Sequence, residues 1–165
     1  MSKEIVIAID PSSTSLGYAI YLDGILNLDG GYGCIKQKQK IPVDERVLNI
    51  TAELWEILNK YKNRRCKKTI ICEDAYVGQS INGSKPNYRI QGILIGFSKV
   101  IGADIHFVYP AHWRKVLNMQ QKGLKRNDYK PISVAYVKNK YGIDVGDDTS
   151  DAICIGDAYL IEKKG

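Results

Sequence analysis

Apolar residues in the first part of the chain follow the pattern of strands. Residues Glu4–Ile9 form a continuous apolar run, which is typical of a strand covered on both faces. A turn rich in Pro and Ser follows, and Leu16–Leu22 alternates enough to predict a second strand. Asp23-Gly24 is a hairpin signal, and a third strand is expected around Leu26–Ile35, interrupted by glycines.

The rest of the chain alternates between strand and helix patterns, because short apolar runs predict strands and three- and four-residue spacing predicts helices. The expected strands are Thr69–Cys72 and Ile105–Val108. The expected helices are Asp44–Tyr61, Tyr88–Ile101, a short one at His112–Leu117, Tyr129–Tyr141 and Asp148–Glu162. The stretch Gly78–Asn87 is rich in Gly, Ser and Asn and is expected to be a mobile loop. This order predicts an α/β fold with a mixed sheet of about five strands flanked by helices.

Composition narrows the class of protein only moderately. The 165 residues are 44% hydrophobic and 25% charged, which indicates one globular domain over residues 1–165. The sequence contains no run of 18 apolar residues, so no membrane span is expected. The first residues lack the features of a signal peptide, so we expect a cytoplasmic protein. Four scattered cysteines and two histidines do not form the clusters that a structural zinc site needs.

Four acidic residues stand where a catalytic metal site could form. Asp10 and Glu73 each follow a predicted buried strand, and functional groups gather at the carboxyl ends of such strands. Asp148 and Asp151 lie three apart at the start of the last predicted helix, so both project from one helical face. Oxygen-only ligands suit Mg²⁺, with Mn²⁺ as a substitute, and two such ions can hydrolyse a phosphodiester without a protein nucleophile.

Each acid also has a plain structural interpretation. An Asp in a first helical turn is usually a capping or dipole residue, and Asp10 before a proline could be a turn residue. Asp147 is an alternative ligand to Asp148. The net charge is +6, and if four acids were committed to a metal site the remaining surface would carry about +10 (+6 plus four), a reasonable field for a polyanion.

Three segments of the chain form an ordered set of motifs: Ile7–Ile20 (IAIDPSSTSLGYAI), Ile71–Tyr76 (ICEDAY) and Asp148–Ala152 (DTSDA). In this order they resemble the RuvC family of Holliday junction resolvases, in particular its phage-encoded branch. The resemblance implies a ribonuclease H-like fold and a homodimer that places paired nicks across a four-way DNA junction, with two metal ions per subunit. A phage-encoded protein would act in the host cytoplasm, and that branch of the family is expected to accept other branched DNAs as well.

Further residues are candidates for contact with DNA. By position in the resemblance, Tyr76 matches an aromatic inserted near the branch point, Lys130 a basic catalytic residue near the scissile phosphate, and Lys115 more loosely a basic contact. A tyrosine packing at the base of a loop and a solvated lysine are the competing interpretations. Two basic stretches could also track phosphates: Lys62–Lys68, with Arg64 and Arg65, and Lys122–Arg126, with Lys122, Lys125 and Arg126.

Three other functions compete with a DNA nuclease. The Ser-rich turn after Asp10 could cradle a phosphate, as in sugar kinases and actin-like ATPases, although no second phosphate loop is visible. A non-catalytic module that binds branched DNA is the second alternative. RNA as the substrate is the third, because nothing in the sequence predicts whether a 2′-hydroxyl is read.

Overall fold

A central mixed sheet organises the protein. The computed structural model describes residues 3–75 and 81–165, and within them the sheet has six strands. The strands are β1 (Glu4–Asp10), β2 (Ser15–Leu22), β3 (Ile25–Leu26), β4 (Tyr32–Lys36), β5 (Lys67–Glu73) and β6 (Asp104–Val108). Their order is β3-β2-β1-β5-β6, with β4 also paired to β2. The β1–β5 and β5–β6 pairs are parallel and the other pairs are antiparallel, so the predicted mixed sheet is confirmed.

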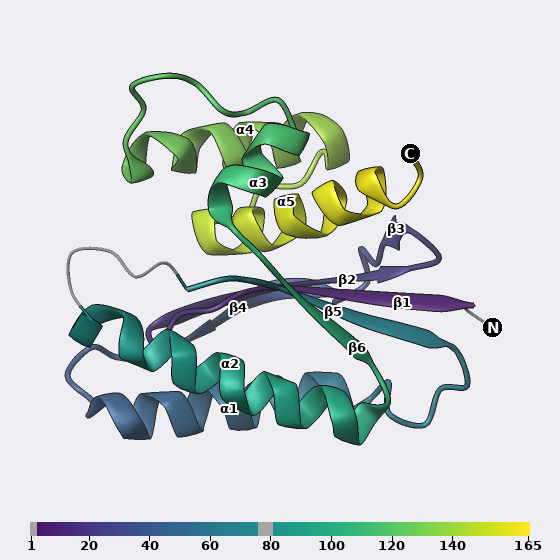
Figure 1. Ribbon diagram of the computed structural model, residues 1–165, viewed down its shortest axis with the longest axis vertical. Coiled ribbons are helices and arrows are strands. Elements are labelled where there is room, and N and C mark those ends of the chain that lie inside the picture. The colour runs from purple at the N-terminus through teal and green to yellow at the C-terminus, as the bar shows by residue number, and fades with distance from the viewer. Residues whose placement is uncertain (1–2, 76–80) are drawn as a thin grey trace.

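Helices cover both faces of this sheet (Figure 1). On one face lie α1 (Val43–Asn59) and α2 (Ile81–Ile101). On the other lie α3 (Pro110–Val116), α4 (Tyr129–Tyr141) and α5 (Asp147–Glu162), with the short turn η1 (Arg126–Asp128) before α4. None of the described helices is long and apolar enough to cross a membrane.

The alternation of side chains along β1 explains why both faces are covered. Ile5, Ile7 and Ile9 belong to the core under α1 and α2. Val6 and Ala8 point the other way and belong to the core under α5. All five are buried, which accounts for the unbroken apolar run in the sequence.

Two expectations from the sequence were wrong in part. The predicted third strand is two strands, β3 and β4, because a turn with a left-handed Gly30 separates them. Residues 78–80 of the predicted loop Gly78–Asn87 lie outside the described residues, and the loop is helical from Ile81 onward, so α2 begins seven residues earlier than Tyr88. Its Pro86 is the sixth residue of the helix, so it removes one intrahelical hydrogen bond, and the burial of Ile90 and Leu94 against the sheet offsets that cost.

Candidate active site

Asp10 and Glu73 end two neighbouring parallel strands. Ile9 pairs with Cys72 in the β1–β5 ladder, and the two acids are the next residues along each strand. Asp10 has the parity of Ala8, and Glu73 has the parity of Ile71, whose side chains lie in the core under α5. Both carboxylates therefore belong to one end and one face of the sheet, the face on which α5 lies.

The start of α5 is brought to this place by a close contact with β2. Gly17, which pairs with Asp10 across β1 and β2, lies against the backbone carbonyl of Asp148. A Cβ atom at position 17 would overlap the carbonyl oxygen of Asp148 and lie only 2.6 Å from its carbonyl carbon. Glycine is thus the residue that allows the first turn of α5 to approach the end of β1.

The three acids in the first turns of α5 have different surroundings. Ser15 Oγ donates a hydrogen bond to Asp148 Oδ2, and this ties the helix to β2 a second time. Asp147 Oδ2 accepts from Lys130 Nζ at 2.5 Å, and this contact lowers the pKa of the Asp147 carboxyl. Burial raises the pKa of Asp151, whose Oδ1 is buried with no hydrogen-bond partner.

Glu73 is held by a buried aromatic residue. The indole Nε1 of Trp113, which is fully buried on α3, donates to Glu73 Oε2 at 2.8 Å. The guanidinium of Arg114 lies over the rings of Trp113 and Tyr129, at 4.8 Å and 4.4 Å from their centroids. The positive charge of Arg114 also acts on Asp151, where it opposes the effect of burial on the pKa. Helix α3 therefore orients Glu73 through Trp113, and through Arg114 it opposes the rise in the pKa of Asp151.

The carboxylates act electrostatically on two nearby cysteine thiols. Burial raises the pKa of the Cys72 thiol, and the charges of Asp10 and Glu73 raise it further. Burial also raises the pKa of the Cys34 thiol, with smaller contributions in the same direction from Asp148 and Asp10. Asp10 is thus close enough to influence the same groups as Glu73 on one side and Asp148 on the other.

The donor set at this end of the sheet suits a hard divalent cation. All candidate ligands are carboxylate oxygens, and the unpartnered Oδ1 of Asp151 is an acceptor that a cation would satisfy. Within residues 3–75 and 81–165, however, no three His, Cys, Asp or Glu side chains are already grouped so that they could hold a metal ion. A metal ion at this end of the sheet would take its ligands from acids on three separate elements, β1, β5 and α5.

The other predicted residues are distributed over two regions. Lys115 on α3, and Lys122 and Lys125 on the loop before α4, are exposed. Arg64 and Arg65 are also exposed, but they precede the first residue of β5, at the opposite end of that strand from Glu73. Tyr76 lies outside the described residues, as does the side chain of Arg126.

Comparison with solved structures identifies the arrangement of strands and helices. A structure of RuvC from T. thermophilus in complex with a Holliday junction substrate matches with a TM-score of 0.74 at 17% identity. That match covers 98% of this chain and 95% of the other. This chain has the fold of RuvC. A second structure, of Thermus thermophilus RuvC, matches with a TM-score of 0.69 at 18% identity, over 97% of this chain and 95% of that chain.

The likeness to RuvC confirms the predicted ribonuclease H-like fold. The sequence itself matches no protein-family model, and comparison with curated proteins gives no match. The likeness to RuvC is therefore a likeness of fold.

Three residues that shape the site were not singled out from the sequence. Gly17 carried a usable signal, because an isolated glycine inside a strand often marks a close approach of another backbone. Ser15 and Trp113 carried none, since their partners Asp148 and Glu73 lie 133 and 40 residues away in the chain.

Proposed function

We propose that the protein is a divalent-metal-dependent endonuclease that cuts branched DNA, with four-way junctions as its main substrate. The observation that carries the proposal is the convergence of acids from β1, β5 and α5 at one end of a RuvC-like fold. The RuvC structure that this chain resembles is in complex with a Holliday junction substrate. The ordered sequence motifs around Asp10, Glu73 and Asp151 support the same assignment.

In this proposal Asp10, Glu73, Asp148 and Asp151 hold two Mg²⁺ ions, for which Mn²⁺ can substitute. When bound, such ions supply an activated water and stabilise the leaving oxygen of the phosphodiester. The protein supplies the geometry. Trp113 keeps Glu73 in one orientation through a 2.8 Å hydrogen bond. Ser15 and the approach at Gly17 fix Asp148.

Lys130 occupies a suitable place to act on the substrate. It lies in the first turn of α4 and is about half exposed, and its ammonium contacts Asp147 at the start of α5. A phosphate that reaches the acids would meet this positive charge, which can exchange its partner from Asp147 to the phosphate. We therefore keep Lys130 as a catalytic residue and treat Asp147 as its resting partner. Asp148 is then the preferred metal ligand of the two.

We also propose a homodimeric assembly and a branched DNA substrate. A homodimer would place two active sites across the two-fold symmetry of a four-way junction, so that each subunit cuts one strand. The excess of positive charge, +6 over the chain, favours a polyanionic partner. Exposed lysines at positions 115, 122 and 125 are proposed to contact phosphates. The side chain of Tyr76 is proposed to stack at the branch point, as an aromatic face can on an unpaired base.

A cleavage assay on synthetic DNA tests the proposal. The full chain is incubated with a labelled four-way junction, a three-way junction, a flap and a linear duplex, with and without Mg²⁺. We expect paired nicks in the four-way junction that require the metal. Asp10→Asn and Asp151→Asn should abolish cleavage and leave junction binding largely intact. Asp29→Asn, at an exposed turn between β3 and β4, is the matched control and should cleave normally.

The other outcomes of this assay separate the competing functions. Full activity of Asp10→Asn would refute the metal-site assignment. Tight junction binding by the unsubstituted protein without cleavage would indicate a binding module instead. Preferential cleavage of an RNA version of the junction would change the substrate class. Binding of ATP by the pure protein, with no effect on DNA, would indicate the kinase-like alternative.

A further inference from the structure

Arg114 on α3 is held between two aromatic rings. Its guanidinium carbon lies 4.8 Å from the centroid of the Trp113 ring and 4.4 Å from that of Tyr129, the first residue of α4. Arginine stacks on aromatic faces in this way because its charge is delocalised over a plane. The two rings therefore hold the positive charge of Arg114 where α3 meets the start of α4.

This guanidinium acts on the candidate active site. Burial raises the pKa of the Asp151 carboxyl, whereas Ser133 of α4 lowers that pKa through a hydrogen bond and Arg114 lowers it through its positive charge. Trp113, on whose ring Arg114 stacks, donates to Glu73 Oε2 at 2.8 Å. Arg114 is thus linked to acids of two elements, to α5 through its charge and to β5 through Trp113.

The acids at the start of α5 repel one another. After burial, which is the largest cause, the charges of Asp147 and Asp148 also raise the pKa of Asp151. Asp147 has a cation of its own, because its Oδ2 accepts from Lys130 Nζ at 2.5 Å. A buried carboxylate without a compensating charge is strongly destabilising. Arg114 supplies a compensating charge for Asp151, and it does so from a third helix.

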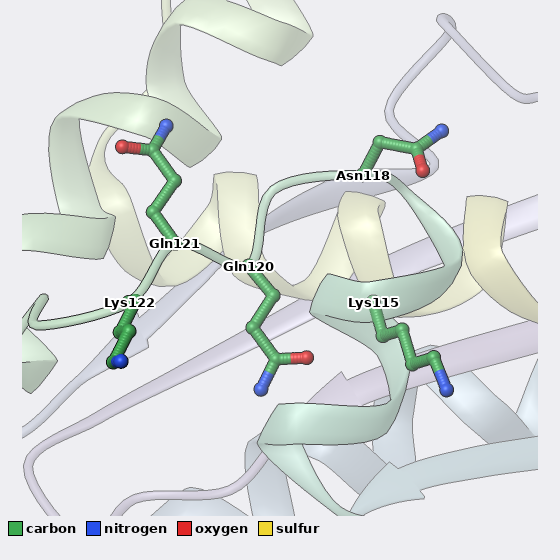
Figure 2. A pocket seen from close by; sticks show the side chains of 5 residues that line it. All are labelled: Lys115, Asn118, Gln120, Gln121 and Lys122. Carbon is green, nitrogen blue, oxygen red and sulfur yellow. The ribbon is translucent and has the colours of Figure 1, made fainter.

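The placement of Arg114 carries a cost that its neighbour on α3 avoids. The Nε of Arg114 is buried and has no hydrogen-bond partner, and leaving a donor of a charged group unsatisfied is expensive. Lys115, the next residue, is exposed and lines a polar pocket of about 500 Å³ at the end of α3 (Figure 2). Attraction between the guanidinium and the acids of α5 accounts for the internal position of Arg114, because it offsets this cost.

We propose that Arg114 is a positioning residue that serves as an internal counter-charge for Asp151 and its acidic neighbours. Its guanidinium offsets the repulsion among these carboxylates, so α5 stays docked beside β1 and β5 before a divalent cation binds. Because like charges repel, Arg114 also weakens the binding of a divalent cation at these acids. The proposal rests on the proposed function, since it gives Arg114 a role toward the same acids.

Removal of the charge at nearly constant side-chain length tests the proposal. Arg114→Met keeps an extended side chain that can pack between the two rings but has no charge. Mn²⁺ binding to the full chain is measured by calorimetry without DNA, and the Tm is measured with EDTA and with Mg²⁺. We expect the Mn²⁺ affinity to rise by about threefold to tenfold, because a repelling charge is removed. In EDTA the Tm should fall by roughly 2–8 °C, and Mg²⁺ should restore part of that loss.

Two further variants separate the charge of Arg114 from its packing. Arg114→Lys keeps the charge and loses the planar stacking, so its Mn²⁺ affinity should stay within about twofold of that of the unsubstituted protein. Lys115→Met removes one positive charge from the adjacent, exposed position on α3. Solvent and salt screen that charge, so this matched control should change the Mn²⁺ affinity by less than about twofold.

A double-mutant cycle in EDTA measures the coupling of Arg114 with Asp151 independently of metal. In an Asp151→Asn background, Arg114→Met should lower the Tm by about half as much or less, because the carboxylate that it neutralises is gone. Equal Tm losses in the two backgrounds would overturn the proposal, and so would an Mn²⁺ affinity that Arg114→Met leaves unchanged or weakens. An equal gain in affinity from Lys115→Met would overturn it as well, in favour of a general effect of net charge. If the unsubstituted protein neither binds Mn²⁺ nor cuts junctions, the proposed nuclease function fails, and the cycle in EDTA still decides the role of Arg114.

Discussion

A methyl group at position 17 tests whether the contact between β2 and α5 sets the geometry of the site. In Gly17→Ala, the new Cβ would lie 2.6 Å from the carbonyl carbon of Asp148, whereas ordinary contacts begin at 3.4 Å. The start of α5 would have to retreat by about 0.8 Å or more, because the obstructing atoms are backbone. Ala152 Cβ, at 3.3 Å from the same position, limits rotation of the helix as a way out.

Two effects of different size follow from this displacement. Overpacking of this kind costs about 1–3 kcal/mol of stability. For a chain of this length, that cost lowers the Tm by roughly 2–12 °C. A displacement of about 1 Å at reacting groups can lower a rate about a hundredfold, so the loss of cleavage should exceed what partial unfolding explains. The acids of α5 would move away from Asp10 and Glu73 while the strands stay in place.

The assay compares cleavage, junction binding and thermal unfolding of the variant with those of Gly96→Ala. Gly96 lies on α2 with nothing within 4 Å of a built Cβ, so the same substitution there meets open space. It should stabilise the helix by about 0.5–1 kcal/mol and leave cleavage unchanged. A Gly17→Ala protein that cuts junctions at the normal rate would refute the reasoning. So would a Tm loss with no loss of cleavage, since α5 would then not position the acids.

Three further predictions concern two residues beside the candidate acids and one contact near the far end of α5. Trp113→Phe keeps an aromatic ring but removes the hydrogen-bond donor to Glu73. In a metal titration, the Mg²⁺ concentration for half-maximal cleavage should therefore rise by about tenfold to a hundredfold. An unchanged titration would show that Trp113 only fills the core. Asp148→Asn should abolish cleavage, because Ser15 and Gly17 hold Asp148 beside Asp10. Asp147→Asn should retain most of the cleavage. The reverse ranking in the junction assay would make Asp147 the metal ligand. Tyr141→Phe should lower stability at neutral pH by about 1.5–3 kcal/mol in denaturant unfolding, because the hydroxyl donates at 2.6 Å to the buried Asp157. Burial and Asp157 raise the pKa of Tyr141 above its usual 10.0, so its contribution is present below pH 10 and is lost as the pH rises further; the variant should show a shallower alkaline loss, and equal slopes would contradict this.

The fold could be predicted from sequence where one physical signal dominates. The apolar run Glu4–Ile9 and the periodic segment Asp44–Tyr61 correspond to β1 and α1 within one to two residues. The start of α2 could not be predicted, because Gly83, Pro86 and Asn87 carry strong loop signals. Tertiary packing overrides these local preferences, since the buried Ser84, Ile90 and Gln91 fix the helix against the rest of the protein.

One part of the candidate site could be predicted from the sequence and another part could not. The expectation that Asp10 and Glu73 end neighbouring strands was right, because the α/β pattern favours a parallel sheet in which strands from separate parts of the chain end at the same edge. The docking of α5 depends on contacts of Asp148 with Gly17 and Ser15, more than 130 positions apart in the chain, which no spacing rule supplies. Whether these acids hold two metal ions, as predicted, stays a prediction.

The position of the acids on α5 is determined by two contacts along one strand. Gly17 of β2 meets Asp148, and four residues later Tyr21 meets Gly156, where a Cβ would overlap the tyrosine ring. Four strand residues span about 13 Å and eight helical residues about 12 Å, so both contacts can form together in one register. A slide of α5 by one turn, about 5.4 Å, would break both at once. Near the far end of the helix, the Tyr21 hydroxyl and Lys140 Nζ contact Asp157 at 3.1 Å and 2.9 Å. These contacts fix the position of α5 along β2. They therefore also fix the position of the carboxylates in its first turns.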